Sequence, residues 1–594
     1  MRLSPIPKSV EPLPGTFGSI SSLSVDLDFT PSQRFGTALR IVPTLNLQAT
    51  NPNAGGIKLI LAPEICGLEA YRLAIYPESI TIEASTETGL YRGLTTLQHI
   101  SNKAPKTLPC LKIEDSPDLE VRGYMLDISR CKVPTLETLY DLIDQLTSLK
   151  YNQLQLYTEH TFAYQNHACV WKDVSPLTAE DIRSLDSYCH NRYIELVPNQ
   201  NSFGHMERWL RHDDYKHLAE CPDGYIHPIL GKRDAGGTLK PNQASLNFMS
   251  ELYDELLPNF RSNQVNIGGD EPWELGQGWS AEETKSKGKH RVYLDHLLSI
   301  HRLVAERDKT TQFWGDIILE SPELSAELPN DSIGIIWGYE ADHPFESQCA
   351  AFAESGIPFY VAPGTSAWNT IGGRYANAVA NIKAATRQAI EHGAKGMLLT
   401  DWGDFGHHHF PPISYPALVW ASTLSWNHDS EENFDDIHAI NTIFFDGESE
   451  ILAQAIVSLS ESINAFSHKP VNRTVLNDVL FCNQEKLQEH LEKTTSKELD
   501  SCCIALTKLH RHLADKRFRT KNASQSNQEL LLTIKLLLFA INKGLANIGT
   551  QSPEYDQLES ELNAFTEEYH KLWLVRNRIG GLEESLTYLT KSLQ

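Results

Sequence analysis

The pattern of apolar and polar residues divides the chain into three regions with different periodicities. Residues 1–118 contain short β-type runs such as 57–62, followed by an amphipathic helical stretch over 89–100. Residues 119–430 alternate short apolar runs with amphipathic helical stretches, which is typical of β/α units that form a parallel sheet. Residues 431–594 carry Leu, Glu, Lys and Gln at helical spacing, so we expect helices there.

The central region contains enough strand-like runs to close a barrel. An open doubly wound sheet could use six of them, but no G-x-G-x-x-G motif follows any of these runs. We therefore predict an α/β chain, with a TIM (β/α)8 barrel between a small N-terminal α+β domain and an α-helical C-terminal domain. The eight runs are 123–127, 153–157, 195–198, 264–268, 312–315, 334–337, 359–362 and 397–402.

Composition and charge exclude several classes of protein. With 594 residues the chain has room for several domains, and its 52 basic and 76 acidic residues give a net charge of −24, which repels nucleic acid and anionic membrane surfaces. Ten scattered cysteines without a C-x-x-C motif are typical of reduced thiols, and the first residues lack an apolar signal segment. We expect a cytoplasmic protein with no nucleic-acid or membrane partner. Wide apolar stripes on the C-terminal helices would allow a homodimer.

The ends of the predicted strands carry the residues that are candidates for catalysis or ligand binding. In a β/α barrel the active site lies at the C-terminal ends of the strands. Nearly every such end in this chain contains a carboxylate, an amide, a histidine or a tryptophan, and eight of the 11 tryptophans lie between positions 273 and 426. Aromatic rings cover the apolar face of a sugar while polar groups bind its hydroxyls, so this mixture favours a carbohydrate site.

The most specific feature is the segment Gly268-Gly269-Asp270-Glu271, which follows the apolar run 265–267. Two glycines at a strand end allow a tight turn, and two consecutive carboxylates in that turn repel each other unless one is protonated. One of these carboxyl groups is therefore a candidate general acid. Exposed Asp-Glu pairs are common, so the buried strand and the glycines are what distinguish this pair.

The adjacency of the two acids constrains the mechanism. Ordinary glycosidases place two carboxyl groups on opposite sides of the scissile bond, about 5–5.5 Å apart when they retain configuration and about 6.5–9.5 Å apart when they invert it. Neighbours in sequence flank a bond poorly. If the substrate supplies its own nucleophile, the protein needs one acid and one adjacent anion. The carbonyl oxygen of a 2-acetamido sugar can be that nucleophile.

The segment Val265–Glu271 resembles the strand-4 catalytic motif of glycoside hydrolase family 20, the β-N-acetylhexosaminidases. Residues 122–130 resemble the strand-1 signature of that family, and residues 91–99 are similar to the end of its N-terminal accessory domain. The resemblance covers about residues 1 to 430. Three more segments fit later strand ends: Pro198–His205, Trp314–Asp316 and Asp401–Asp404.

The resemblance implies an exo-acting hydrolase that removes terminal GlcNAc or GalNAc from small oligosaccharides or other β-glycosides, with no cofactor and no metal. It implies Glu271 as the general acid/base and Asp270 as the carboxylate that orients the acetamide and stabilises an oxazolinium-like intermediate. Arg130 would bind O3 and O4 of the sugar, and Asp404 would bind the O4 and O6 side. The other implied site residues, which line the pocket or support it, are Glu159, His160, His205, Trp314, Trp337, Tyr339, Trp368, Asn369 and Trp402.

Some positions depart from the family pattern. Asn266 stands where the catalytic motif often begins with His, and Asn199-Gln-Asn201 replaces an acidic Pro-Glu-x-Asp pattern. The tyrosine that polarises the acetamide carbonyl is open between Tyr339 and Tyr360, because Trp368-Asn369 occupies the segment where the family suggests it.

Two rival functions and several questions stay open. His407-His408-His409 lies close to Asp401 and Asp404, which raises a metal-dependent hydrolase as one alternative. A non-catalytic carbohydrate-binding protein is the other. Arg130 could also form a structural bridge to Asp127 instead of binding sugar. The sequence leaves open the choice between GlcNAc and GalNAc, the linkage and aglycone preference, and the oligomeric state.

Overall fold

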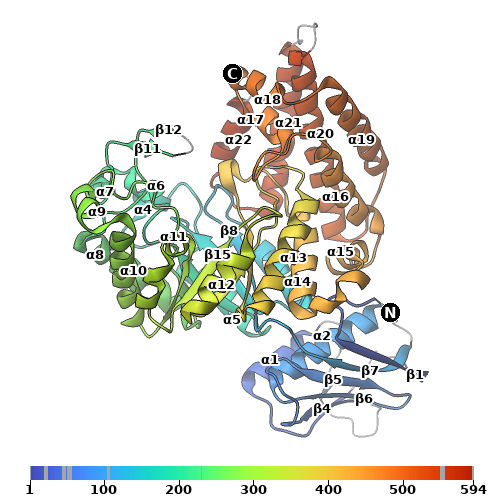
Figure 1. The fold of residues 1–594 in the computed structure, drawn as a ribbon. Helices are drawn as coiled ribbons and strands as arrows, with labels where there is room; N and C mark the ends of the chain where they lie inside the picture. Colours follow the sequence, from blue (N-terminus) through green and yellow to red (C-terminus); the bar gives the residue numbers. More distant parts are fainter. Residues whose placement is uncertain are drawn as a thin grey trace.

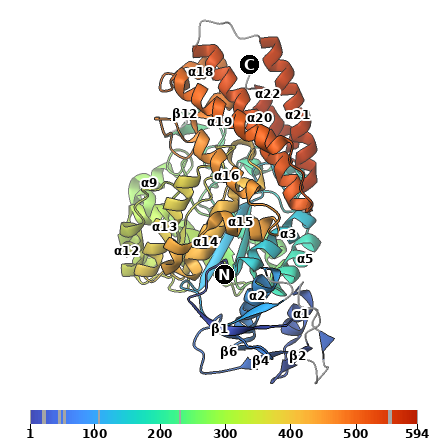
Figure 2. The same cartoon turned by 90° about the vertical axis from the view of Figure 1, so that its right-hand side faces the viewer.

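The computed structural model describes residues 2–18, 24–42, 48–49, 56–103, 107–228, 231–548 and 555–591. An N-terminal sheet domain lies at one end of a central barrel, and a group of long C-terminal helices rises from the other end (Figure 1). The termini of the chain lie in these two outer domains (Figure 2).

The N-terminal domain is a seven-stranded sheet, in the order β1-β7-β5-β6-β4-β2-β3, covered by two helices. The side chains of β6 alternate between the two faces of the sheet. Ile80, Ile82 and Ala84 point into the core, while the residues between them are half-buried. The elements are β1 (Ser9–Phe17), β2 (Ser24–Leu27), α1 (Gln33–Ile41), β3 (Gln48–Ala49), β4 (Ile57–Leu61), β5 (Tyr71–Ile75), β6 (Ile80–Ala84), α2 (Glu87–Lys103) and β7 (Leu108–Asp115).

The central domain is a closed barrel of eight parallel strands, so the predicted fold class is confirmed. The barrel closes where β17 pairs with β8, and Gly396 allows this approach because a Cβ there would lie 2.5 Å from Cβ of Val121. Every predicted run overlaps one of the eight barrel strands: β8 (Val121–Asp127), β9 (Gln153–Thr158), β10 (Glu195–Gln200), β13 (Gln264–Asn266), β14 (Thr310–Trp314), β15 (Ile333–Trp337), β16 (Phe359–Ala362) and β17 (Gly396–Asp401).

Helices surround the barrel, and side-chain caps define where several of them begin. Thr135 and Asn242 accept hydrogen bonds from backbone N–H groups in the first turn of α3 and α8, and Thr178 forms a capping box with Asp181 on α5. The surrounding helices are α3 (Leu136–Ser148), α5 (Ala179–His190), α8 (Gln243–Leu256), α10 (Lys289–Ala305), α12 (Phe345–Ser355), α13 (Tyr375–Glu391) and α14 (Tyr415–Trp426).

Short elements occupy the long loops between the strands and helices of the barrel. They include a small hairpin that stands above the barrel mouth, opposite the C-terminal helices (Figure 1). These elements are α4 (Ala168–Trp171), α6 (Glu207–Leu210), α7 (Asp213–Lys216), β11 (Tyr225–His227), β12 (Gly231–Arg233), η1 (Leu257–Asn259), α9 (Ala281–Lys287), α11 (Asp316–Glu320), η2 (Pro322–Glu327), η3 (Asp404–Gly406), η4 (Pro411–Ser414) and η5 (His428–Asn433).

The C-terminal region is helical, and its apolar stripes pack within the chain. Helix α20 is long and apolar enough to span a membrane, alone among the helices in the described ranges, yet it packs against α17, α19 and α21. Its buried Glu529 forms an ion pair with Arg576 at 2.6 Å. The helices are α15 (Asp436–Phe444), α16 (Glu450–Ile463), α17 (Val475–Phe481), α18 (Gln484–Leu491), α19 (Ser496–Ala514), α20 (Lys521–Ile548), α21 (Tyr555–Arg576) and α22 (Leu582–Thr590).

Candidate active site

The turn after β13 brings the two consecutive acids to the barrel mouth. Gly268 and Gly269 have φ angles of 71° and 92°, and a Cβ on Gly268 would lie 1.9 Å from Oδ1 of Asn201, so the turn requires glycine there. Glu271 also has a positive φ, 48°, which is uncommon for a residue with a side chain. The predicted tight turn is therefore present, and it directs both carboxyl groups to one site.

A single histidine contacts both acids. Nε2 of His205 lies 3.3 Å from Oδ2 of Asp270 and 3.7 Å from Oε2 of Glu271. His205 is in the left-handed region as well, with φ 59°. Oδ1 of Asp270 is buried and has no hydrogen-bond partner among the described residues. Buried acceptors are normally satisfied, so this oxygen is available to a hydrogen-bond donor on a ligand.

Burial and neighbouring charges separate the proton affinities of these groups. Burial raises the pKa of Glu271, and the charge of Asp270 adds to the rise, while His205 opposes it. Burial lowers the pKa of His205, but the charge of Asp270 and the hydrogen bond to it outweigh burial and raise that pKa to about 10. His205 is therefore a cation at neutral pH, and Glu271 is suited to carry a proton.

Asp316 is a third carboxyl group in this part of the mouth, and no sequence motif assigned a role to it. Its Oδ2 accepts the backbone N–H of Glu271 at 3.4 Å. Burial and then the charge of Asp270 raise the pKa of Asp316 to about 8. The strand-end segment Trp314-Gly-Asp316 was the available signal. We call the following residues the acid half of the mouth: His205, Asp270, Glu271 and Asp316.

The opposite side of the mouth is built around Arg130. Its NH1 lies 3.0 Å from Oδ2 of Asp127 and its Nε lies 3.1 Å from Oε1 of Glu159. The bridge to Asp127, considered above as an alternative role, is therefore present, and it fixes a guanidinium whose side chain is still 20% exposed. Asp404 belongs to the same cluster, since burial raises its pKa and the charge of Arg130 opposes that rise. We call these residues the sugar-binding half: Asp127, Arg130, Glu159 and Asp404.

Aromatic rings form a wall between the two halves. Nε1 of Trp402 donates to the hydroxyl of Tyr339 at 2.8 Å, and Tyr339 stacks on Trp337 with ring centroids 5.3 Å apart. Trp314 and Trp368 are only 1% exposed and lie behind this wall, where Trp314 contacts Trp402 and Trp368 contacts Tyr339. Trp314 and Trp368 therefore support the wall rather than face solvent.

The structure distinguishes the two candidate tyrosines. The hydroxyl of Tyr360 donates to Oε1 of Gln264, the first residue of β13, at 3.3 Å. Tyr360 thus lies deep in the barrel, toward the N-terminal ends of the strands. Tyr339 follows the end of β15 and lies at the mouth. Since its hydroxyl oxygen accepts from Trp402, its own proton is available for donation toward the pocket.

Two of the expected site residues lie farther from the acids. His160 is 1% exposed, and burial followed by the charge of Arg208 lowers its pKa well below the usual range. The carbonyl of Asn369 accepts the backbone N–H of Thr474 at 3.2 Å, in the C-terminal region. Across the described residues, no hydrogen bond or ion pair links His160 or Asn369 to the acid pair.

Neutral amides occupy the positions that depart from the family pattern. Nδ2 of Asn199 and Nδ2 of Asn266 each donate to Oε1 of Gln155 at 3.0 Å, inside the barrel. Nδ2 of Asn201 donates to the hydroxyl of Tyr157 at 2.6 Å. The three asparagines therefore form an uncharged layer below the mouth, and His205 has Asp270 and Glu271 as its acidic partners in the described structure.

The histidine triplet does not form a metal site. Nε2 of His409 lies 3.3 Å from Oδ1 of Asp401, whereas Nε2 of His408 lies 3.0 Å from the carbonyl oxygen of Ser585 in α22. The rings thus point to different partners. No group of three or more His, Cys, Asp or Glu side chains in the described part of the chain is arranged to hold a metal ion. These residues do not fit the donor set that a metal-dependent hydrolase needs.

Comparison with known families identifies the chain. A family model described as glycosyl hydrolase family 20, catalytic domain, matches residues 120–383, and one described as glycosyl hydrolase family 20, domain 2, matches residues 1–116. The two models together cover well over half of the sequence. The chain belongs to glycosyl hydrolase family 20. The recognition of this family from sequence motifs is confirmed.

Curated relatives of this family 20 chain include two proteins with related names. One is a beta-hexosaminidase of Akkermansia muciniphila, 23% identical over 323 residues, which are 48% of this chain and 64% of that protein. Another is hexosaminidase D of Homo sapiens, 26% identical over 239 residues, which are 38% of this chain and 46% of that protein. The matched part thus spans less than two thirds of either relative.

Solved structures show the same family 20 architecture. The Flavobacterium johnsoniae chitobiase covers 96% of this chain and 98% of its own, with a TM-score of 0.63 and 19% identity. A family 20 exo β-N-acetylglucosaminidase of Vibrio harveyi, in complex with N-acetylglucosamine, covers 77% of this chain with a TM-score of 0.60 and 18% identity. The first of these likenesses spans the C-terminal helices as well as the barrel.

Proposed function

We propose that this chain is an exo-acting β-N-acetylhexosaminidase. It hydrolyses terminal, non-reducing GlcNAc or GalNAc β-glycosides with retention of configuration, and the 2-acetamido group of the substrate is the nucleophile. Membership of family 20 and the names of the curated relatives support this activity. One observation carries the mechanism: Asp270 and Glu271 lie on the same turn and share the ring of His205.

Two carboxyl groups that contact one imidazole nitrogen lie on the same side of the site. They cannot stand on opposite faces of a glycosidic bond, as the acid and nucleophile of an ordinary retaining enzyme must. One of them is free to protonate the leaving oxygen, and the other lies next to it, where the acetamide would bind. This arrangement supports attack by the substrate's own amide oxygen.

The reaction then assigns a task to each acid. The acetamide oxygen attacks C1 and forms a C1–O bond, while the bond to the aglycone breaks and Glu271 gives its proton to the leaving oxygen. The electron pair of that bond leaves with the aglycone, and the oxazolinium-like product is positively charged. Asp270 accepts the amide N–H and stabilises that charge. Glu271, now ionised, takes a proton from a water molecule that opens the ring at C1.

Tyr339 and the sugar-binding half complete the pocket. We assign Tyr339 as the donor that holds the acetamide carbonyl, because its hydroxyl lies at the mouth and its proton is not used by Trp402. Arg130 and Asp404 bind the hydroxyls at the far end of the ring. A further sugar attached there would meet these two half-buried side chains, so the enzyme acts on terminal residues.

The proposal includes a cytoplasmic location for the enzyme. All ten cysteines are free in the structure, and eight of them are buried or half-buried. Disulfides are rare in reducing compartments, so free thiols support a cytoplasmic enzyme that trims small oligosaccharides.

A chromogenic β-GlcNAc glycoside and its β-GalNAc epimer test the proposal. We expect wild type to release the chromophore and Glu271→Gln to release almost none. A thiazoline analogue of the cyclised intermediate should inhibit wild type competitively. If the protein binds the sugar without turnover, it is a non-catalytic carbohydrate-binding protein. If a chelator abolishes turnover, it is a metal-dependent hydrolase.

A further inference from the structure

The segment that joins α21 to α22, together with the first two turns of α22, lies against the barrel mouth. We call residues 576–588 the C-terminal brace. This brace contacts the loop that carries Arg130 and the loop that carries Asp404. Its Glu584 also forms an ion pair with Arg208, in the segment that follows His205. Among the described residues it forms no hydrogen bond or ion pair with the turn that carries Asp270 and Glu271. Neither the family models nor the mechanism above uses it.

The brace pairs with the loop that follows Arg130. The backbone N–H of Thr135 donates to the carbonyl of Arg576 at 2.9 Å, and the N–H of Arg578 donates to the carbonyl of Val133 at 2.8 Å. Gly581 lies directly on Cys131, because a Cβ at Gly581 would be 2.0 Å from the Cys131 carbonyl oxygen. The residue next to Arg130 is therefore held by the brace.

The brace also holds the loop that follows Asp404. The hydroxyl of Ser585 donates to the carbonyl of Gly406 at 2.6 Å, and Nε2 of His408 lies 3.0 Å from the carbonyl oxygen of Ser585. Gly406 packs on Tyr588, since a Cβ at Gly406 would lie 2.9 Å from Cδ2 of that ring. Ser585 is completely buried, so its hydroxyl has no access to water as an alternative partner.

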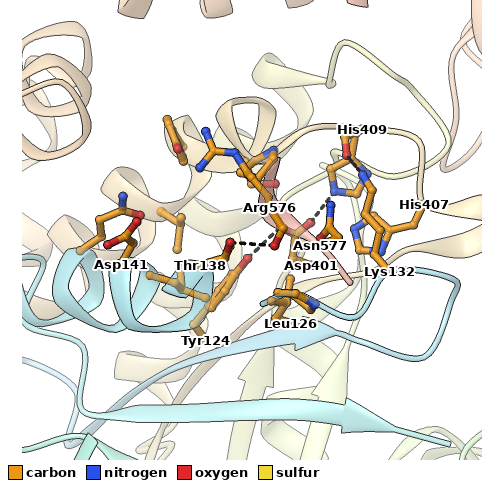
Figure 3. A pocket seen from close by; sticks show the side chains of 17 residues that line it. Tyr124, Leu126, Lys132, Thr138, Asp141, Asp401, His407, His409, Arg576 and Asn577 are labelled. Carbon is orange, nitrogen blue, oxygen red and sulfur yellow. Dashed lines mark hydrogen bonds and ion pairs between the residues drawn. The ribbon is translucent and has the colours of Figure 1, made fainter. Parts of the chain in front are cut away.

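The two loops are joined to each other below the brace. Nζ of Lys132 donates to the carbonyl of His409 at 2.6 Å, and Asp401 accepts from the hydroxyl of Tyr124 at 2.8 Å. Figure 3 shows these side chains, together with Arg576, around a small cavity of about 80 Å³. A displacement of the brace would therefore move both loops together.

Both loops contain backbone that needs support. Cys131, Phe405 and His407 have φ angles of 70°, 56° and 51°, and these residues flank Arg130 and Asp404. Residues with side chains persist in this region only where the surrounding contacts hold them. The brace supplies such contacts at Cys131 and at Gly406.

We propose that the C-terminal brace positions Arg130 and Asp404 for binding of the sugar hydroxyls, with Ser585 and Gly581 as its positioning residues. This inference rests on the proposed function. The sugar-binding half of the pocket thereby depends on a separate helical domain at both of its loops, whereas the brace reaches the acid half only at Arg208, three residues after His205, among the described residues. The brace touches no substrate, so its effect reaches the reaction through the two loops.

The test couples a brace residue to a substrate hydroxyl. Ser585→Ala removes the hydrogen bond to Gly406, and Thr587→Ala is the matched control, because the exposed Thr587 hydroxyl bonds only to Glu583 within the same helix. The substrates are a chromogenic β-GlcNAc glycoside and its 4-deoxy and 6-deoxy analogues. For the parent substrate we expect Ser585→Ala to lower kcat/KM about three- to tenfold, mainly through KM. Thr587→Ala should equal wild type.

The deoxy substrates distinguish positioning from general damage. An analogue that lacks the sugar hydroxyl bound by Arg130 or Asp404 cannot benefit from their positioning. For at least one of the two deoxy analogues, the ratio of kcat/KM between wild type and Ser585→Ala should therefore fall close to one. A ratio that is the same for all three substrates would overturn the proposal, as would a lower melting temperature with unchanged kcat/KM. If Ser585→Ala does not fold, Tyr588→Leu is used instead, because it loosens the contact of the brace with Gly406. The ratios of kcat/KM between wild type and Tyr588→Leu for the three substrates then test the proposal in the same way. A wild type that releases no sugar would refute the proposed function itself.

Discussion

The two halves of the barrel mouth balance charge in opposite ways. In the acid half, two carboxyl groups contact one imidazole and a third, that of Asp316, lies close to both acids, while His205 and Glu271 adopt left-handed backbone. In the sugar-binding half, one guanidinium is paired with two carboxylates at 3.0 and 3.1 Å, and the brace supports the adjoining loops. Each half holds one cation and three carboxyl groups, but the carboxyl groups of the first half raise the pKa values of one another, whereas two of those in the second half are fixed by close ion pairs to Arg130.

This difference follows from what each half does. A general acid needs a raised pKa, and a buried cluster of carboxyl groups provides it at a cost in stability. A hydroxyl-binding site needs fixed donors and acceptors, which paired charges provide while they stabilise the fold. Substitutions should therefore separate activity from stability in the acid half and reduce both together in the sugar-binding half.

The largest effect is expected for Glu271→Gln. The amide keeps the shape of the side chain but cannot protonate the leaving oxygen, so kcat on an unactivated glycoside should fall by about 10³-fold or more. Because one of three crowded carboxyl groups is removed, the melting temperature should stay the same or rise. Steady-state kinetics and a thermal melt check both results. A large loss of stability would contradict the contrast between the halves.

The second-largest loss of activity is expected for Asp270→Asn. An amide cannot neutralise the cationic intermediate, so we expect kcat to fall by about 10²- to 10³-fold, as when a preorganised stabilising group is removed. Unlike Glu271→Gln, this loss should persist with a highly activated leaving group such as dinitrophenol, which needs little protonation. Near-normal rates with either leaving group would refute the assisted mechanism.

Arg130→Ala should reduce activity and stability together. Loss of a charged donor to sugar hydroxyls should lower kcat/KM by about 10²-fold, mainly through KM. The buried carboxylates of Asp127 and Glu159 also lose their counter-charge, so the free energy of unfolding should drop by about 3 kcal/mol. Urea denaturation measures the second effect. Unchanged stability would mean that this half is not held by its ion pairs.

The smallest effect is a shift in the pH profile of His205→Asn. Asparagine tolerates the left-handed backbone at this position. Protonated His205 lowers the pKa of Glu271, so its removal should raise that pKa further. The general acid then stays protonated to higher pH, and the alkaline limb of kcat/KM should move upward although the maximum falls. An alkaline limb that moves downward would show that His205 does not act on Glu271 through its charge.

The sequence predicted the barrel and the acid pair because both leave local signals. Apolar runs mark each of the eight strands, and the two glycines before Asp270 mark a turn that only a few residues can adopt. The predicted domain boundaries at 118 and 430 stay predictions, although β7 and β8 lie on either side of the first.

The contacts between distant segments could not be predicted in the same way. Ser585 is 179 positions from Gly406, and nothing in either local sequence indicates that they meet. Asp316 was visible as a strand-end residue, but its importance depends on its closeness to Asp270 in space. The choice of Tyr339 over Tyr360 likewise required knowing which end of the barrel each hydroxyl faces.

The nucleophilic role of the substrate amide is tested most directly by substrates whose N-acetyl methyl carries zero, one, two or three fluorine atoms. Fluorine withdraws electrons from the carbonyl oxygen and makes it a weaker nucleophile, with little change in size. We predict that kcat/KM of the wild-type protein falls steeply and steadily along this series. Rates that do not respond to fluorination, or a glycosyl group trapped covalently on a protein side chain, would contradict the account.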